Sequence, residues 1–202
     1  ATGQLLSAGT NFTGVRLNLR GYAVTATVGV GGGTCCSVDE SVVVTPGTVA
    51  IGRGPHAVEQ VRFSNCRISP GDVAIALASP NDAPGKSPKV AFARGFYRGP
   101  VIVITNTTPT GKWTLAVSDS DFEFTTPGTL NFGRPQISGS RFTYLATNCT
   151  GVTCGPSDGG IIEETDFIGA TLYASANSII RRCLFGDVCA EYALYTGANC
   201  LV

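Results

Sequence analysis

Short apolar segments separated by proline and glycine turns are the feature that most constrains the fold of this chain. The segments are rich in Val, Ile, Thr and Phe, and 26 glycines and 11 prolines punctuate them. Turn signals such as Thr45-Pro46-Gly47 and Thr126-Pro127-Gly128 recur at roughly 8 to 12 residues or more, which favours a sandwich or barrel over alternating βα units. The sequence therefore predicts an all-β protein with a β-sandwich or jelly-roll-like architecture.

Alternation of apolar and polar residues predicts half-buried strands near the N-terminus, at residues 15–19 and 22–30. Further strands are expected at residues 41–44, 48–51, 57–63, 73–78, 89–93, 101–106, 113–117, 122–125, 129–132 and 142–146. We expect three regions along the chain. They are an N-terminal strand segment (1–33), a β-sandwich module (34–126) and a disulfide-rich C-terminal β region packed on it (127–202).

Residues 161–185 fit two kinds of secondary structure. Acidic residues early in this segment, with Arg181 and Arg182 late, complement a helix dipole and predict a short helix. However, residues 178–185 have strand length, and residues 166–172 resemble one turn of a parallel β-solenoid. One or two turns cannot bury their own faces, so a solenoid is not predicted. A short helix and strands stay equal alternatives.

Cysteines and glycosylation sequons together predict an extracellular or cell-surface protein. Sequons for N-linked glycans begin at Asn11, Asn106 and Asn148, and we expect these side chains to be exposed. A secretory route would also allow the eight cysteines to form disulfides. They are Cys35, Cys36, Cys66, Cys149, Cys154, Cys183, Cys189 and Cys200. The chain begins at Ala1 and has no methionine, which we interpret as removal of a signal peptide.

The pairing of the cysteines is only partly constrained by their positions. Cys35 and Cys36 need two different partners, because a strand points neighbouring side chains apart. Cys149 with Cys154 and Cys183 with Cys189 are candidate local loops, which leaves the other four for long-range bonds. We expect all eight to be oxidised within one chain, with bonds between protomers as the alternative.

Residues 47–117 carry a resemblance to a known class of module. The segments are GTVAI at 47–51, VRFSN at 61–65, ISPGDVAIAL at 68–77 and GPVIVITN at 99–106. Their pattern of strands and turns resembles small β-sandwich modules of phage tail fibres and related virion or cell-surface fibre proteins. Cys66 and the sequon at Asn106 depart from phage proteins and suit a secreted relative. The resemblance implies a stable module used in fibres, with no activity attached.

Charge and hydropathy argue against two classes of partner. The formal net charge is zero and 14% of residues are charged, so no electrostatic surface for nucleic acid or anionic lipid is expected. No apolar stretch reaches the ~20 residues of a membrane helix, so we expect no membrane insertion.

Catalytic and metal motifs are weak throughout the chain. The one histidine, His56, has no nucleophile elbow to work with. The cysteine spacings miss those of zinc sites, and Asp119-x-Asp121-x-Glu123 lacks the glycine and distant glutamate of a calcium loop, so a solvated strand edge is the preferred interpretation. The sequence predicts no enzyme, no metal and no cofactor. A polysaccharide hydrolase stays an alternative, with carboxylates that spacing cannot pair at Glu40, Glu59, Glu163, Glu164, Asp166 and Glu191.

We expect a structural subunit of an extracellular fibre, filament or surface layer. Its partners would be copies of itself, joined head to tail. Val15, Leu17 and Leu19 have the alternation of a strand donated to a neighbouring subunit, whereas an ordinary hairpin over residues 14–30 is equally compatible. A carbohydrate-binding or adhesion module is the first alternative. Its candidate sugar-stacking aromatics are Phe96, Tyr97, Trp113, Tyr144, Tyr173, Tyr192 and Tyr195.

Overall fold

The protein is all-β in the part of the chain that the structure, a computed structural model, describes. The described residues are 3–6, 11–12, 28–30, 35–40, 42–45, 49–51, 60–70, 75–78, 89–100, 104–105, 114–132, 135–145, 152–156, 159–174, 176–187 and 194–202. They contain strands and turns but no helix. Consequently none of them forms a helix long and apolar enough to cross a bilayer.

The strands form three faces, which we number in the order in which the chain visits them from β4 onward. Face 1 is an eight-stranded sheet of β2 (Asn11–Phe12), β4 (Cys35–Asp39), β7 (Gln60–Ser64), β10 (Lys89–Ala93), β13 (Thr114–Ser118), β16 (Gln136–Ser138), β19 (Ile161–Glu163) and β22 (Ile179–Arg181). Face 2 is a seven-stranded sheet of β5 (Val42–Thr45), β8 (Arg67–Pro70), β11 (Phe96–Gly99), β14 (Asp121–Phe124), β17 (Arg141–Tyr144), β20 (Asp166–Ile168) and β23 (Leu184–Gly186).

Face 3 consists of two sheets that follow one another along the stack. The first contains β1 (Gly3–Leu6), β3 (Val28–Val30), β6 (Val49–Ile51), β9 (Ile75–Ala78) and β12 (Ile104–Thr105). The second contains β15 (Gly128–Phe132), β18 (Val152–Pro156), β21 (Ala170–Ala174) and β24 (Leu194–Thr196). Strands β12 and β15 contact each other, so the second sheet continues the first.

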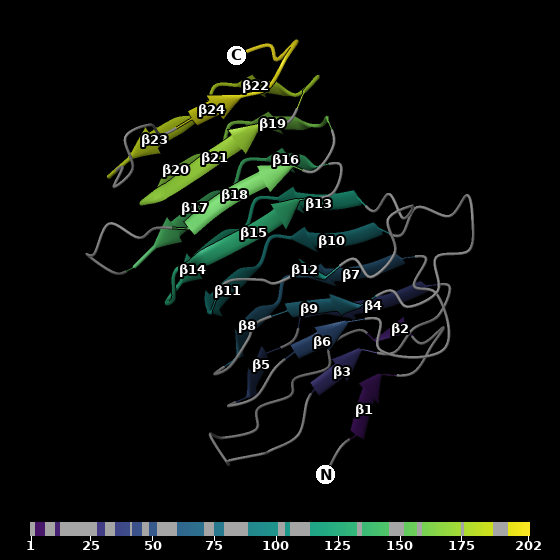
Figure 1. The fold of residues 1–202 in the computed structure, drawn as a ribbon. Coiled ribbons are helices and arrows are strands. Elements are labelled where there is room, and N and C mark those ends of the chain that lie inside the picture. The colour runs from purple at the N-terminus through teal and green to yellow at the C-terminus, as the bar shows by residue number, and fades with distance from the viewer. Residues whose placement is uncertain are drawn as a thin grey trace.

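The described strands wind into a parallel β-solenoid. From β4 onward the chain visits face 1, face 2 and face 3 in a fixed order, and within each sheet a strand pairs in parallel with the strand three positions later. Strands β4 to β24 therefore make seven turns of three strands, stacked from the N-terminal end to the C-terminal end (Figure 1). Each turn therefore contacts its own strands and the turns directly above and below it.

Columns of identical or similar side chains fill the interior, because in-register parallel strands place equivalent residues one above another. On face 2 a column of aromatic residues stacks through five successive turns, with Phe122–Phe142 ring centroids 4.9 Å apart and Phe142–Phe167 5.4 Å apart. Tyr97 and Phe185 are the first and the last of its five residues. On face 1 the corresponding column is aliphatic, with Val117, Ile137, Ile162 and Ile180 all buried in register.

Several expectations from the sequence are corrected by this architecture. The β-sandwich or jelly-roll arrangement, including that of the module expected at 34–126, is not what the described strands form, because every strand pair among them is parallel. The short helix expected near residues 161–185 is replaced by strands β19 to β23. Two solenoid turns there are stable because five more precede them.

Candidate functional site

The connection between face 1 and face 2 repeats the same geometry in every turn, and we call it the corner. Two residues separate the strands at each corner from β4–β5 to β22–β23. The first corner residue is always in the left-handed region, with φ between 47° and 56°. These residues are Glu40, Asn65, Arg94, Asp119, Gly139, Glu164 and Arg182. Backbone bonds between turns continue around the corner, for example from Arg94 N to Ser118 O at 2.9 Å.

The second corner residue is small and mostly carries a hydroxyl or a thiol. Ser120, Ser140 and Thr165 are buried, and each donates its hydroxyl to the carbonyl two residues earlier, at 2.8 Å. The hydroxyl oxygens of Ser120 and Ser140 also accept a bond from the preceding turn, since Gly95 N donates to Ser120 Oγ at 3.1 Å and Ser120 N donates to Ser140 Oγ at 3.2 Å. Cys66 occupies the equivalent position. The corner is thus a structural ladder that satisfies buried polar groups.

A small cavity lies behind the corner at Gly95. Its volume is about 10 Å³, and its lining includes Cys66, Gly95, Ser120 and Phe122. Gly95 has no side chain at the position where the neighbouring turns place the thiol of Cys66 and the hydroxyl of Ser120. A volume near that of one water molecule cannot hold an organic substrate.

Three of the six carboxylates considered for glycoside hydrolysis form ion pairs between turns. Glu163 Oε2 lies 2.6 Å from Arg181 Nη2, and Glu164 Oε1 lies 2.8 Å from Arg182 Nη2. Asp166 Oδ2 lies 3.2 Å from Arg141 Nη2 on face 2. Glu40 is exposed at its corner, and Glu59 and Glu191 lie outside the described residues. These pairs link adjacent strands in the manner of cross-strand pairs.

The acidic triplet around residue 121 is placed differently from the expected strand edge. Strand β14, which carries Asp121 and Glu123, is flanked on both sides by β11 and β17. Glu123 pairs with Arg98, with Oε2 and Nε 3.5 Å apart, and Asp119 occupies a corner. Within the described residues no three potential metal ligands come together.

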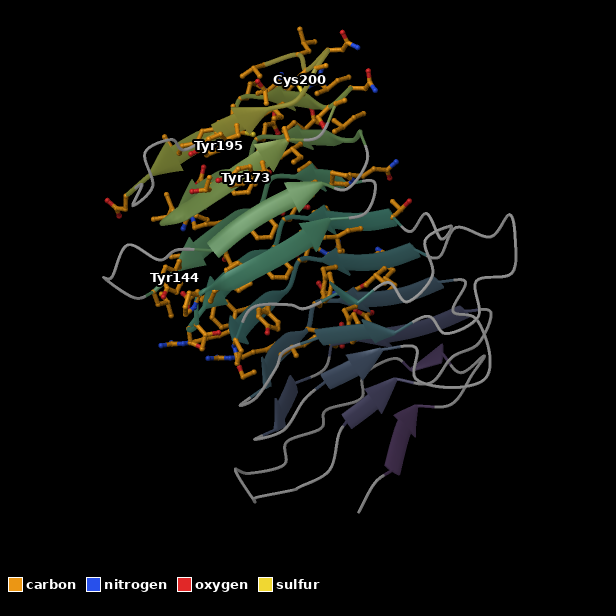
Figure 2. The ribbon with its side chains drawn as sticks, in the orientation of Figure 1. Tyr144, Tyr173, Tyr195 and Cys200 are labelled. Atoms are coloured by element: carbon orange, nitrogen blue, oxygen red, sulfur yellow. The ribbon has the colours of Figure 1, made fainter. Side chains whose placement is uncertain are left out.

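The candidate sugar-stacking aromatics separate into core residues and surface residues. Tyr97 and Tyr144 are buried, and burial raises the pKa of Tyr97. Phe96 lies beneath the Arg67 guanidinium, 5.2 Å from it. Tyr173 and Tyr195 instead project from face 3, with ring centroids 4.3 Å apart and planes within 3° (Figure 2). Trp113 and Tyr192 lie outside the described residues.

The stacked pair of tyrosines was not anticipated as a pair. Tyr173 and Tyr195 are 22 positions apart in the sequence, and only the register of β21 with β24 brings them together. Without that register no local pattern connects the two positions.

The cysteines and sequons are only partly covered by the structure. No disulfide forms among the cysteines whose side chains are described. Cys183 donates a hydrogen bond to Arg181 O, 3.5 Å away, and burial raises the pKa of its thiol. Cys35 and Cys36 lie on β4, Cys154 lies on β18 and Asn11 lies on β2. Cys149, Cys189, Asn106 and Asn148 lie outside the described residues.

The remaining predicted residues also fall outside the described part of the chain. His56 and the assembly residues Val15, Leu17 and Leu19 are among them. The described strands on either side of residues 15–19 pair within the chain, β2 with β4 and β3 with both β1 and β6. The hairpin over residues 14–30 is not seen at β3, where both neighbours are parallel.

Comparison with known proteins places the chain in no family: no family model, no curated protein and no solved structure matches it.

Proposed function

We propose that the chain is a rigid structural module of an extracellular fibre, filament or surface layer. The module is secreted, glycosylated at Asn11, Asn106 or Asn148, and reinforced by disulfides. Copies of it associate head to tail along the solenoid axis.

The observation that carries this proposal is the uninterrupted aromatic column on face 2. Tyr97, Phe122, Phe142, Phe167 and Phe185 stack ring on ring through consecutive turns, so each turn is a template for the next. Ion pairs such as Arg141–Asp166 join the same turns on the outside. An architecture whose contacts all run along one axis suits a protein that bears load along that axis.

The C-terminal end of the stack supports association along the axis. Among the described residues, β23 and β24 each have a neighbouring strand on one side only. Apolar side chains are exposed at this end, with Leu201 65% and Val202 70% exposed. Unpaired strand edges beside exposed apolar groups favour pairing with another chain. A head-to-tail contact is heterologous, so it propagates into a filament unless its rotation closes a ring.

Negative-stain microscopy and light scattering over a concentration series test the proposal. We expect unbranched filaments whose length increases with concentration. The double variant Leu201→Asp, Val202→Asp places charges at the contact and should return the protein to folded monomers. Leu145→Asp is the matched control, because Leu145 is 41% exposed on the side of the stack. Monomers at every concentration, or filaments that survive the double variant, would contradict head-to-tail association.

A further inference from the structure

Tyr173 and Tyr195 form a stack of two phenol rings on the outer side of face 3. The two residues are opposite each other in the parallel register of β21 with β24. Their ring centroids are 4.3 Å apart, the angle between their planes is 3°, and Figure 2 shows one ring above the other. Strands in parallel register point equivalent side chains the same way, so the hydroxyl ends of both rings lie on the same side of the pair.

The ring of Tyr173 is open to solvent, unlike that of a tyrosine in the core. Tyr173 is 43% exposed although Tyr195 covers one of its faces, and Tyr195 itself is half-buried. Tyr97, by contrast, is buried against Phe122, whose ring has no hydroxyl. An oxidant in solution can therefore reach the stacked pair and meets two phenols in contact there.

We propose that Tyr173 and Tyr195 are a site of oxidative cross-linking, at which the two rings join to form dityrosine. The oxidant is a haem peroxidase that uses hydrogen peroxide. Each hydroxyl gives up one electron and one proton, which leaves two phenoxyl radicals. A carbon–carbon bond then forms between two carbons next to the hydroxyls, and the hydrogens on those carbons return to the oxygens. The two electrons and two protons released reduce one hydrogen peroxide to two waters.

The stacked geometry favours coupling within one chain. Two radicals on separate molecules must meet by diffusion, whereas the rings of Tyr173 and Tyr195 are already in contact. Holding two reacting groups together converts a bimolecular step into a unimolecular one, with a large gain in rate. We therefore expect the bond between these two residues to form before any bond between molecules.

The bond would close one turn of the solenoid into a covalent ring. Strands β22 and β23 lie between the two tyrosines in the sequence, so residues 173–195 make one complete turn. Among the described strands, β24 pairs with β21 alone. A cross-link between these strands limits the conformations of the unfolded chain, as a disulfide does. This property goes beyond that of a structural module and does not depend on head-to-tail association, because it lets an oxidant stabilise one turn after folding.

Oxidation of the full chain by a haem peroxidase and hydrogen peroxide tests the proposal. We expect dityrosine fluorescence in the monomer band of a denaturing gel, and a mass lower by two hydrogen atoms. Trypsin cuts after Arg181 and Arg182, so after reduction and alkylation of the cysteines only the cross-link joins the peptides of the two tyrosines. The melting temperature should rise by about 5 to 10 °C.

Phenylalanine variants separate this pair from the other tyrosines, because they keep the ring and its stacking but remove the hydroxyl. Tyr173→Phe and Tyr195→Phe should each lower the yield of dityrosine within the chain about tenfold or more. Tyr144→Phe and Tyr192→Phe are the matched controls. We expect both controls to keep the yield of the original protein.

Several results would overturn the proposal. They are absence of dityrosine from the monomer band, a cross-linked peptide that joins other tyrosines, and an undiminished yield from Tyr173→Phe or Tyr195→Phe. A melting temperature that does not rise would also do so, because the bond would then not constrain the turn. Circular dichroism of each variant confirms that it is folded before it is oxidised.

Discussion

The corner has the same length in every turn, whereas the other two connections of each turn vary in length. The corner always has two residues, whereas the connection from face 2 to face 3 varies from one residue, Gly169, to the seven residues of 145–151. The connection from face 3 to face 1 varies from three residues (133–135) to ten (79–88). Because the corner alone is constant, it sets the register of the stack, and the variable connections absorb insertions.

This difference explains how a regular structure is encoded by an irregular sequence. Successive corners are 18 residues apart between Glu164 and Arg182 but 29 residues apart between Asn65 and Arg94. A fixed period, which would identify a solenoid in the sequence, is therefore absent. What repeats is a local pattern in which a left-handed residue is followed by a small residue, usually Ser, Thr or Cys.

Insertion of one glycine should give the largest difference in stability between the corner and a variable connection. Between Gly139 and Ser140 it would shift β17 by one residue, turning Phe142 and Tyr144 outward and Arg141 and Thr143 inward. We expect a loss of about 3 kcal/mol or more in the free energy of unfolding, measured by urea denaturation. The same insertion between Thr126 and Pro127 should cost about 0.6 kcal/mol or less. Equal losses at the two places would show that the corner does not set the register.

Removal of one corner hydroxyl should have the next largest effect. Ser140→Ala leaves the amide of Ser120 and the carbonyl of Ser138 without their hydroxyl partner, at a cost of about 1 to 3 kcal/mol. Thr125→Ala, at an exposed position in a variable connection, should change stability by about 0.5 kcal/mol or less. Ser140→Cys should recover part of the loss, because Cys66 occupies the same position in its own turn. If Thr125→Ala lost as much stability as Ser140→Ala, the corner would be no more important to stability than a variable connection.

A methyl group at the first corner position should cost less than the lost hydroxyl bonds. Gly139 has φ +56°, and an added Cβ would lie 2.7 Å from Asp119 Oδ1, the end of a side chain that can move. We expect Gly139→Ala to lower the free energy of unfolding by about 1 to 2 kcal/mol, chiefly from backbone strain. Gly186→Ala is the control for added volume without a left-handed φ, because its Cβ meets only the end of Ile168. Thermal denaturation of both variants shows whether backbone strain or the added volume accounts for the loss of stability at Gly139.

The ion pairs of Glu163 with Arg181 and Arg182 should contribute least to stability. Glu163→Gln weakens its pairs with Arg181 and Arg182, which are exposed, and we expect a loss of about 1 kcal/mol or less. The difference between the two proteins should shrink in 1 M salt, because solvent ions screen exposed charges. A salt-independent loss would mean that Glu163 acts through packing.

Many strand positions in the middle of the chain could be predicted from the sequence, because alternation and turn chemistry are local. The strand expected at residues 89–93 is β10, and those expected at 113–117 and 122–125 lie within one residue of β13 and β14. The sequence did not predict several strands of two to five residues, because so few residues show little alternation; they are β1, β2, β4, β8, β11, β16, β18 and β24. Residues 161–185 were ambiguous because their strands are stable only when paired with the turns before them.

The sequence by itself determined that this chain forms short strands with one apolar side and close turns between them. Only the tertiary structure decided which strands pair and in which direction, and hence that Tyr173 and Tyr195 stack on each other. The physical reason is that side chains alternate with a period of two in parallel and antiparallel sheets alike. Alternation therefore carries no information about the partner, which depends on how connections of unequal length close each turn.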